Sequence, residues 1–137
     1  MKIFQKEIEI ETEKINHFVK ITEEVENVVR ESKIKNGMVF LNALHTTSAL
    51  IIQENDSTIH EDLVKILERA APLSEKYKHD YEGNENATAH IKSNLLGSFL
   101  SIPLKDGKLL LGTWQDIFFL ELFEARKRKV FVTVIGE

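Results

Sequence analysis

The chain has 137 residues, a net charge of −4 and no cysteine. This length suits one globular domain, and the acidic balance argues against broad electrostatic binding to nucleic acid or to anionic membranes. Without cysteine, disulfides and thiolate chemistry are excluded, so any reaction must use histidine, carboxylate, hydroxyl or lysine side chains. Charged residues interrupt the N-terminus, which offers no apolar run for a signal peptide or a membrane span and predicts a cytoplasmic protein.

The first forty residues predict a strand followed by a helix. Apolar and charged residues nearly alternate over 1–10, as in a strand with one solvated face. Thr22, followed by two glutamates, is a good N-cap for a helix that Gly37 ends.

Two strand segments come next, with a polar interruption between them. The apolar run 38–44 is too short for a typical helix and predicts a buried strand. The apolar character resumes at 49–52, so residues 45–48 are interpreted as a polar kink or bulge. Side chains at such a break are easily directed into a pocket.

The middle of the chain predicts two helices and a long loop. Asp56 or Ser57 can cap a helix with apolar residues at helical spacing. The polar stretch 73–85 predicts a loop, and loops of this length in small domains are often functional. Asn86 is predicted to cap a short third helix that Gly97 stops.

The last forty residues predict a β-meander. Its strands are expected at 98–104, 109–112, 116–122 and 130–135, and the Asp106-Gly107 pair favours a hairpin turn between the first two. Together the elements predict an α+β fold of antiparallel, sandwich-like β-sheets with about three helices packed on them, in a single domain over 1–137.

Three of the five histidines fall at predicted element boundaries: His45, His79 and His90. Three imidazoles brought together could hold a divalent cation, zinc or magnesium, in an open site. No short HxxxH or HxH spacing supports this, and each histidine could instead be a structural hydrogen-bonding residue.

Other candidates lie near the C-terminus. Trp114 and Gln115 could hold a flat heterocycle by stacking and hydrogen bonding, or could be a core tryptophan and an edge glutamine. Glu121 could be a general base, a metal ligand or a solvated carboxylate. Arg126 and Arg128 belong to a basic cluster that could bind phosphate or could be a solvated turn.

These residues form an ordered series that resembles the YjbQ-like family, often labelled secondary thiamine-phosphate synthase. The series covers nearly the whole chain: His45-Thr46-Thr47-Ser48-Ala49, Glu54, Asp62, Tyr77, His79, Asn86, Ala89-His90, Gly97, Leu111-Gly112-Thr113-Trp114-Gln115, Glu121, Arg126 and Arg128. One departure is Phe123-Glu124-Ala125-Arg126 where the family commonly has an Asp-Gly-Pro-Arg type of turn. Alanine resists the positive φ that glycine supplies, so this turn is expected to differ.

The resemblance implies a compact sheet and helix fold, a homotrimer, and a modest ability to join a pyrimidine diphosphate to a thiazole phosphate. We expect catalytic roles for His45, Thr47, Glu54, His79, His90 and Glu121. We expect contacts with a small phosphorylated substrate from Thr46, Ser48, Asn86, Trp114, Gln115, Arg126 and Arg128.

Two other functions remain open. The chain could be a metal-binding protein or a metal-dependent hydrolase, with His45, His79 and His90 as the ligands. It could also bind a ligand without turnover. All three hypotheses require these side chains, from the early kink to the late tryptophan, to meet in one cavity.

Overall fold

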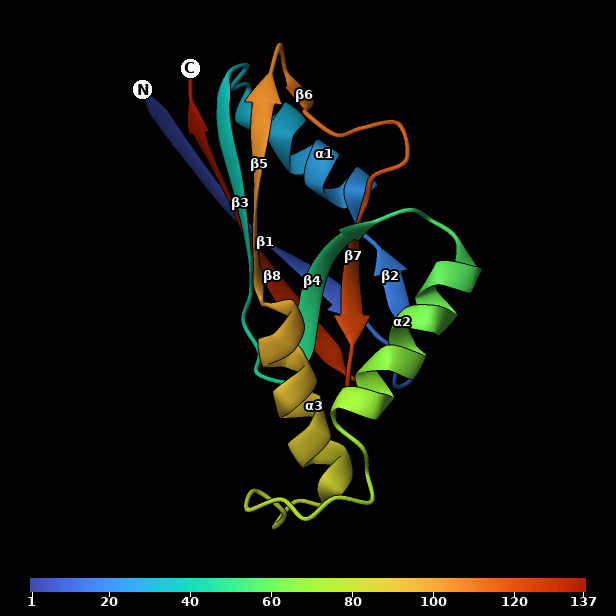
Figure 1. Cartoon of the computed structure of the whole chain (residues 1–137). Helices are drawn as coiled ribbons and strands as arrows, with labels where there is room; N and C mark the ends of the chain where they lie inside the picture. The colour runs from blue at the N-terminus through green and yellow to red at the C-terminus, as the bar shows by residue number, and fades with distance from the viewer.

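The computed structural model describes all 137 residues, in eight strands and three helices. In chain order they are β1 Lys2–Glu11, β2 Phe18–Lys20, α1 Thr22–Ser32, β3 Gly37–Ala43, β4 Ser48–Gln53, α2 Ser57–Ala70, α3 Asn84–Leu96, β5 Phe99–Lys105, β6 Lys108–Leu109, β7 Asp116–Glu121 and β8 Lys127–Gly136. Figure 1 shows the two termini side by side, where β1 pairs with β8. The predicted α+β class, with antiparallel sheets and three helices, is confirmed.

The larger sheet has the strand order β1-β8-β3-β5-β6, and all its pairs are antiparallel. Burial along β8 alternates, with Val130, Val132 and Val134 fully buried and the residues between them partly open. This is the period-two pattern of a sheet with one covered face. Gly37 and Gly136 are paired where β3 and β8 approach closely, and a Cβ on either would meet backbone at 1.9 Å.

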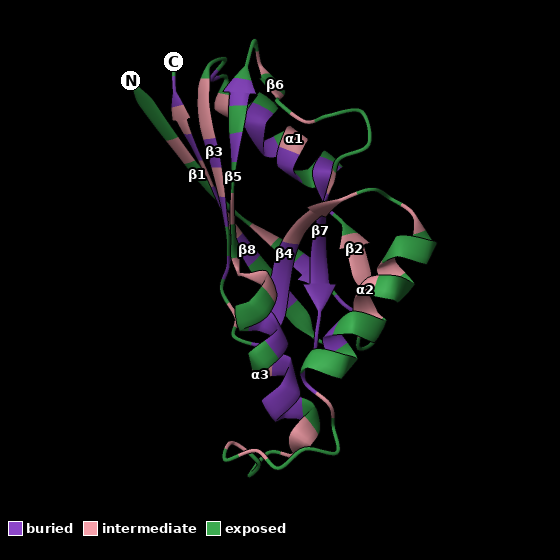
Figure 2. Ribbon diagram, in the orientation of Figure 1, coloured by how far each residue is buried: buried purple, intermediate pink, exposed green.

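The smaller sheet has the order β2-β7-β4, and its central strand is buried on both faces (Figure 2). Ile117 and Phe119 of β7 face the main core, whereas Phe118 contacts His60 of α2 and Leu120 packs with Ala89 of α3. Helices α2 and α3 therefore cover one face of this sheet while the larger sheet covers the other. This explains why 117–120 is a continuous apolar run and does not alternate.

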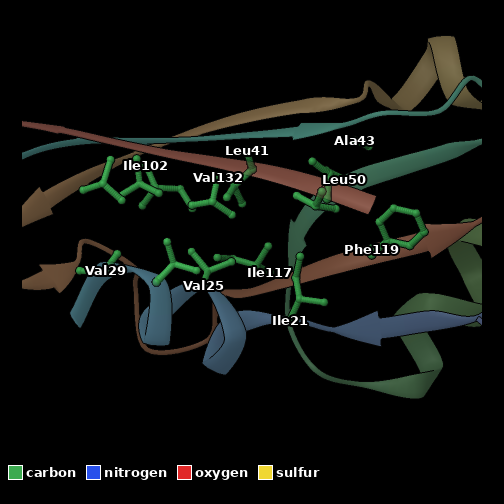
Figure 3. Packing of buried hydrophobic residues seen from close by; sticks show 14 of the residues in the cluster. Ile21, Val25, Val29, Leu41, Ala43, Leu50, Ile102, Ile117, Phe119 and Val132 are labelled. Atoms are coloured by element: carbon green, nitrogen blue, oxygen red, sulfur yellow. The ribbon is translucent and has the colours of Figure 1, made fainter. Parts of the chain in front are cut away.

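The main core is a cluster of 17 buried residues between the two sheets and α1 (Figure 3). Val25 and Val29 of α1 and Ile117 of β7 lie opposite Leu41 and Val132 of the larger sheet. Burying a side chain of this kind stabilises the fold by about 1.5–3 kcal/mol. No helix combines the length and the apolar character needed to cross a membrane.

The predicted β-meander is wrong. Only β5 and β6 form a hairpin, with positive φ at Asp106 and Gly107 as a type I′ turn requires. Strand β7 leaves this sheet for the centre of the smaller one, and β8 returns to lie between β1 and β3. Hairpin signals are local, so they could not show that 116–121 pairs with strands from the first half of the chain.

Two strands that were expected on either side of a kink also belong to different sheets. Strand β3 pairs with β5 and β8, whereas β4 pairs with β7. Residues 44–47 are therefore a link between sheets and not a bulge within one. Their side chains are placed at the junction of the two sheets.

Three predicted helix ends shift. Thr22 is the first residue of α1 and does not cap it; its hydroxyl donates to Asp116 Oδ1 (2.7 Å) and accepts from the N–H of Ile117 (2.9 Å). Helix α1 ends at Ser32, with left-handed Lys33 as its C-cap, well before Gly37. Helix α3 begins at Asn84, so Asn86 lies inside it, whereas the Asp56 cap of α2 is confirmed.

Candidate functional site

One cavity of about 380 Å³ lies where the β3–β4 link, the first half of α3 and the start of β8 meet. We call it the His45 cavity. It is lined by Leu44, His45, Thr46, Thr47, Glu82, Asn86, His90, Arg126 and Arg128. The structure thus brings together seven of the thirteen residues predicted for the site, from three separate parts of the chain.

Arg128 forms the floor of this cavity and is held by Glu121. The arginine is 2% exposed and the glutamate 0%. Arg128 Nε donates to Glu121 Oε1 (2.8 Å), and its Nη2 donates to Glu121 Oε2 and to Thr47 Oγ1 (2.9 Å). Its Nη1 makes no hydrogen bond within the chain and remains available to a ligand. The geometry is the bidentate arrangement that fixes a guanidinium in one orientation.

Glu121 is a buried acceptor whose two oxygens are both in use. Oε1 also accepts from Thr12 Oγ1 (2.7 Å), and Oε2 accepts from the N–H of Phe123 (3.0 Å). Burial by itself would raise the pKa of Glu121, but the hydrogen bonds from Arg128, Thr12 and Phe123 lower it overall. A low-pKa carboxylate with no free oxygen is poorly suited to be a general base, one of the three roles that the sequence left open for Glu121. Its location fits a residue that positions Arg128.

Arg126 reaches the same cavity from the loop before β8. Its backbone N–H donates to Thr12 Oγ1 and its carbonyl accepts from the N–H of Thr12. Its guanidinium pairs with Glu124 and lies 5.1 Å from the centre of the Phe123 ring. No residue of 122–126 has positive φ, as suits a loop that contains no glycine.

His45 is a half-buried imidazole with a defined tautomer. The backbone N–H of Lys129 donates to its Nε2 at 2.7 Å. An amide can only donate, so Nε2 carries no proton and the neutral ring has its proton on Nδ1. Burial and the charges of Arg128, Arg126 and Lys129 lower the pKa of His45, against an opposing effect of Glu121. His45 is therefore a neutral donor through Nδ1, and it does not belong to the group of close ligand atoms formed by His79, Glu82 and His90.

Helix α3 contributes an amide and an imidazole. Asn86 and His90 are one helical turn apart, and both line the cavity. Asn86 is buried, and its Oδ1 has no hydrogen-bond partner. A buried acceptor without a partner is costly, so this oxygen is suited to receive a donor from a ligand.

A possible ligand set for a cation lies at the edge of the cavity. His79, Glu82 and His90 each offer one ligand atom, and these atoms lie within 4.8 Å of one another. The ring centres of His79 and His90 are 4.8 Å apart. Tyr81 Oη contacts His79 Nδ1 at 2.9 Å, whereas His79 Nε2 is buried without a partner. The structure thus brings Glu82, and not His45, close to His79 and His90.

Six predicted residues do not line the His45 cavity. Glu121 holds Arg128 and His79 lies at the edge of the cavity, whereas the other four lie elsewhere. Glu54 follows the far end of β4 and is exposed, and Ser48 is fully buried with an unpaired Oγ. Trp114 is 72% exposed, and Gln115 lines a different cavity, beside α1, where its Oε1 accepts from the N–H of Gly112. The expectation of one cavity for all predicted residues is therefore wrong within a single chain.

Sequence reasoning missed two contributors to the site. Glu82 stands three residues after His79, a spacing that could have drawn attention to it. Thr12 forms hydrogen bonds with both Glu121 and Arg126, more than a hundred residues away in sequence, and no local pattern indicates this role.

The whole chain is similar to proteins of one family. The family model described as "UPF0047 protein YjbQ-like" matches residues 6–137. A UPF0047 protein of Archaeoglobus fulgidus is 39% identical over 129 residues, covering 94% of this chain and 99% of that protein. One from Methanocaldococcus jannaschii is 40% identical over 130 residues, covering 94% and 92%.

Solved structures agree with these sequence matches. A crystal structure of a YbjQ-like protein from Sulfolobus solfataricus has a TM-score of 0.93 at 33% identity, covering 99% of each chain. A second, of a YjbQ/UPF0047 family protein from Clostridium acetobutylicum, has a TM-score of 0.87 at 39% identity, covering 95% of this chain and 99% of that one. The chain belongs to the YjbQ-like UPF0047 family.

Proposed function

We propose that the chain is an enzyme that acts on small phosphorylated heterocycles, with the weak thiamine-phosphate synthase activity implied by the family resemblance. The observation that carries this proposal is the convergence of Arg126 and Arg128 on one cavity with His45 and Asn86. Glu82 is the only carboxylate among the lining residues, so the wall favours an anionic ligand.

Each side chain has a role in such a reaction. The free Nη1 of Arg128 and the guanidinium of Arg126 bind the diphosphate and stabilise the charge that grows on it as it departs. His45 donates through Nδ1 to a phosphate oxygen. The unpaired Oδ1 of Asn86 accepts from an amino or hydroxyl group of the ring, which orients the substrate.

A divalent cation fits beside this binding surface. The unpaired, buried Nε2 of His79 is the observation that favours one, since a metal would satisfy it. Two imidazoles and one carboxylate from His79, Glu82 and His90 are a donor set that suits zinc better than magnesium, which prefers oxygen ligands. A bound cation would supply positive charge against the diphosphate.

The substrate proposal is tested by replacing one charge. Arg126→Gln should weaken binding of inorganic diphosphate about tenfold and lower the rate of joining a pyrimidine diphosphate to a thiazole phosphate, because a charge-assisted hydrogen bond is lost. Lys127→Gln is the matched control, since Lys127 is exposed and does not line the cavity. Calorimetry and a product assay measure both effects. Equal diphosphate affinity in wild type and Arg126→Gln would remove the arginine from the site.

A metal-dependent hydrolase is the second candidate, favoured by the grouping of His79, Glu82 and His90. A metal analysis and the variants His90→Asn and Arg126→Gln separate the two functions. Hydrolysis predicts that protein purified without chelator holds about one zinc per chain and that His90→Asn loses the metal together with all turnover. The proposed synthase function requires that Arg126→Gln loses the rate of joining a pyrimidine diphosphate to a thiazole phosphate, whether or not metal is present. His17→Asn, outside the cavity, controls for nonspecific effects.

We also propose that the chain assembles as the homotrimer implied by the family resemblance. Two features of the surface support this. Strand β6 pairs only with Leu104 and Lys105 of β5, so most of the outer edge of β5 has no strand partner. Phe99 and Trp114 are both more than half exposed. A neighbouring subunit could then bring Trp114 to a site that a single chain leaves without it.

A further inference from the structure

Thr12 is a buried residue that joins the end of β1 to the loop before β8. It follows the last residue of β1, is 3% exposed and does not line the His45 cavity. Its backbone N–H donates to the carbonyl of Arg126 (3.0 Å), next to the pair of Glu11 with Lys127 that ends the β1–β8 ladder. Thr12 therefore extends the pairing of these two strands to the arginine itself.

The hydroxyl of Thr12 has two further partners. Its Oγ1 lies 2.7 Å from Glu121 Oε1 and 3.1 Å from both the nitrogen and the carbonyl oxygen of Arg126. The N–H of Arg126 can only donate, so Oγ1 accepts from it. The single hydroxyl proton goes to the carboxylate, which is charged and closer. Thr12 thereby links the backbone of Arg126 to the glutamate that holds Arg128.

Both arginines of the His45 cavity thus depend on one hydroxyl. Arg126 depends on it through its backbone, and Arg128 depends on it through Glu121. Two guanidinium groups can each bind one phosphoryl group of a diphosphate, whereas a single phosphate needs only one of them. The gain from the second arginine is largest when both are held in place before the ligand arrives.

We propose that Thr12 is a positioning residue that fixes Arg126 relative to Arg128, and that this arrangement selects diphosphates over single phosphates. The inference rests on the proposed function, because it assumes that these arginines bind phosphate groups. Thr12 itself touches no ligand and acts only through Glu121 and the backbone of Arg126.

Thr12→Val tests this role, because valine keeps the shape of threonine and lacks the hydroxyl. Calorimetry measures the affinities for inorganic diphosphate and inorganic phosphate. We expect the variant to bind diphosphate about tenfold more weakly, and phosphate within about threefold of wild type, so that the preference for diphosphate falls. Thr12→Ser keeps the hydroxyl and should keep the wild-type preference. An unchanged preference in Thr12→Val, or a reduced one in Thr12→Ser, would overturn the proposal.

Thr22→Val is a matched control for the loss of a buried hydroxyl. Thr22 Oγ1 also donates to a carboxylate, that of Asp116 (2.7 Å), and accepts from a backbone N–H, that of Ile117 (2.9 Å). It lies beside a different cavity, at the start of α1. This variant should keep the wild-type preference for diphosphate. An equal loss of preference in Thr22→Val and Thr12→Val would mean that Thr12 has only a structural role.

The wild-type protein separates this inference from the proposed function. We expect it to bind diphosphate at least about tenfold more tightly than phosphate. Equal affinities would overturn the selection attributed to Thr12 and leave a phosphate-binding cavity in place. Binding of neither anion would contradict the proposed function itself. These measurements need no variant, so they remain decisive even if Thr12→Val does not fold.

Discussion

At the scale of single residues, the site depends on groups whose hydrogen bonds are already committed. Glu121 uses both oxygens to hold Arg128, and His45 uses Nε2 to accept from Lys129. What remains free is the Nη1 of Arg128 and the Nδ1 proton of His45. Two side chains are thereby fixed as donors, which preorganises the cavity for an anion.

The protonation of His45 provides a prediction at this scale. Its pKa should lie below the ordinary value of 6.5, because the ring is partly buried near three cationic side chains. Since the folded protein favours the neutral ring, His45 contributes stability above pH 6.5 that is lost as the pH falls through its folded pKa. Titration of the imidazole resonances by NMR measures this.

Removing one nearby positive charge tests why the pKa of His45 is low. Arg126→Gln should move the pKa of His45 upwards, because one nearby positive charge is lost. Lys127→Gln should move it much less, since that lysine does not act on the ring. A His45 pKa at or above 6.5 in the wild type would contradict the tautomer and the environment described above.

At the scale of elements, the two sheets are joined by short links that carry the site. Residues 44–47 pass from β3 in one sheet to β4 in the other, and 122–126 pass from β7 to β8 in the opposite direction. Both links bring polar side chains to the same junction. Helix α3 lies against β4 (Figure 1), and its residues Asn86 and His90 line the cavity.

The close approach of β3 and β8 at Gly37 predicts that a larger residue there destabilises the fold. Gly37→Ala should destabilise the fold by about 3 kcal/mol or more, because its Cβ would lie 1.9 Å from the carbonyl oxygen of Ile135 and its φ is +154°. Gly112→Ala is the control, since its Cβ would meet only the Gln115 side chain, at 3.5 Å or more, and should cost less than about 1 kcal/mol. Urea unfolding of both variants gives the comparison. Equal midpoints would show that the two strands can move apart freely.

At the scale of the whole molecule, the exposed apolar surface is the feature that the single chain does not explain. Phe99 is 54% exposed and Trp114 is 72% exposed. The proposed trimer predicts a mass of three times the chain's 15.8 kDa in multi-angle light scattering. It also predicts that the fluorescence of Trp114, the only tryptophan, shifts to longer wavelength on dilution below the assembly concentration. A mass of one chain at micromolar concentration would contradict it.

Much of the secondary structure could be predicted from local patterns. The strand at 1–10, the helix capped by Asp56 and the Asp106-Gly107 turn depend on residues close in sequence, and all three are confirmed. The β-meander failed because strand pairing is decided by which faces need covering. A strand such as 116–121, whose residues 117–120 are apolar on both faces, must lie between two layers, and the sequence does not say which layers these are.

For the site, too, the sequence determined some features and only the tertiary structure determined others. The identities of the polar residues, and the family to which they point, could be determined from the sequence alone, because they form an ordered series along the chain. Only the tertiary structure decided that Glu121 is a buried partner of Arg128, that Glu82 joins the two histidines and that Trp114 lies elsewhere. Burial and hydrogen-bond partners depend on residues as far apart as Thr12 and Glu121, and folding alone brings these together.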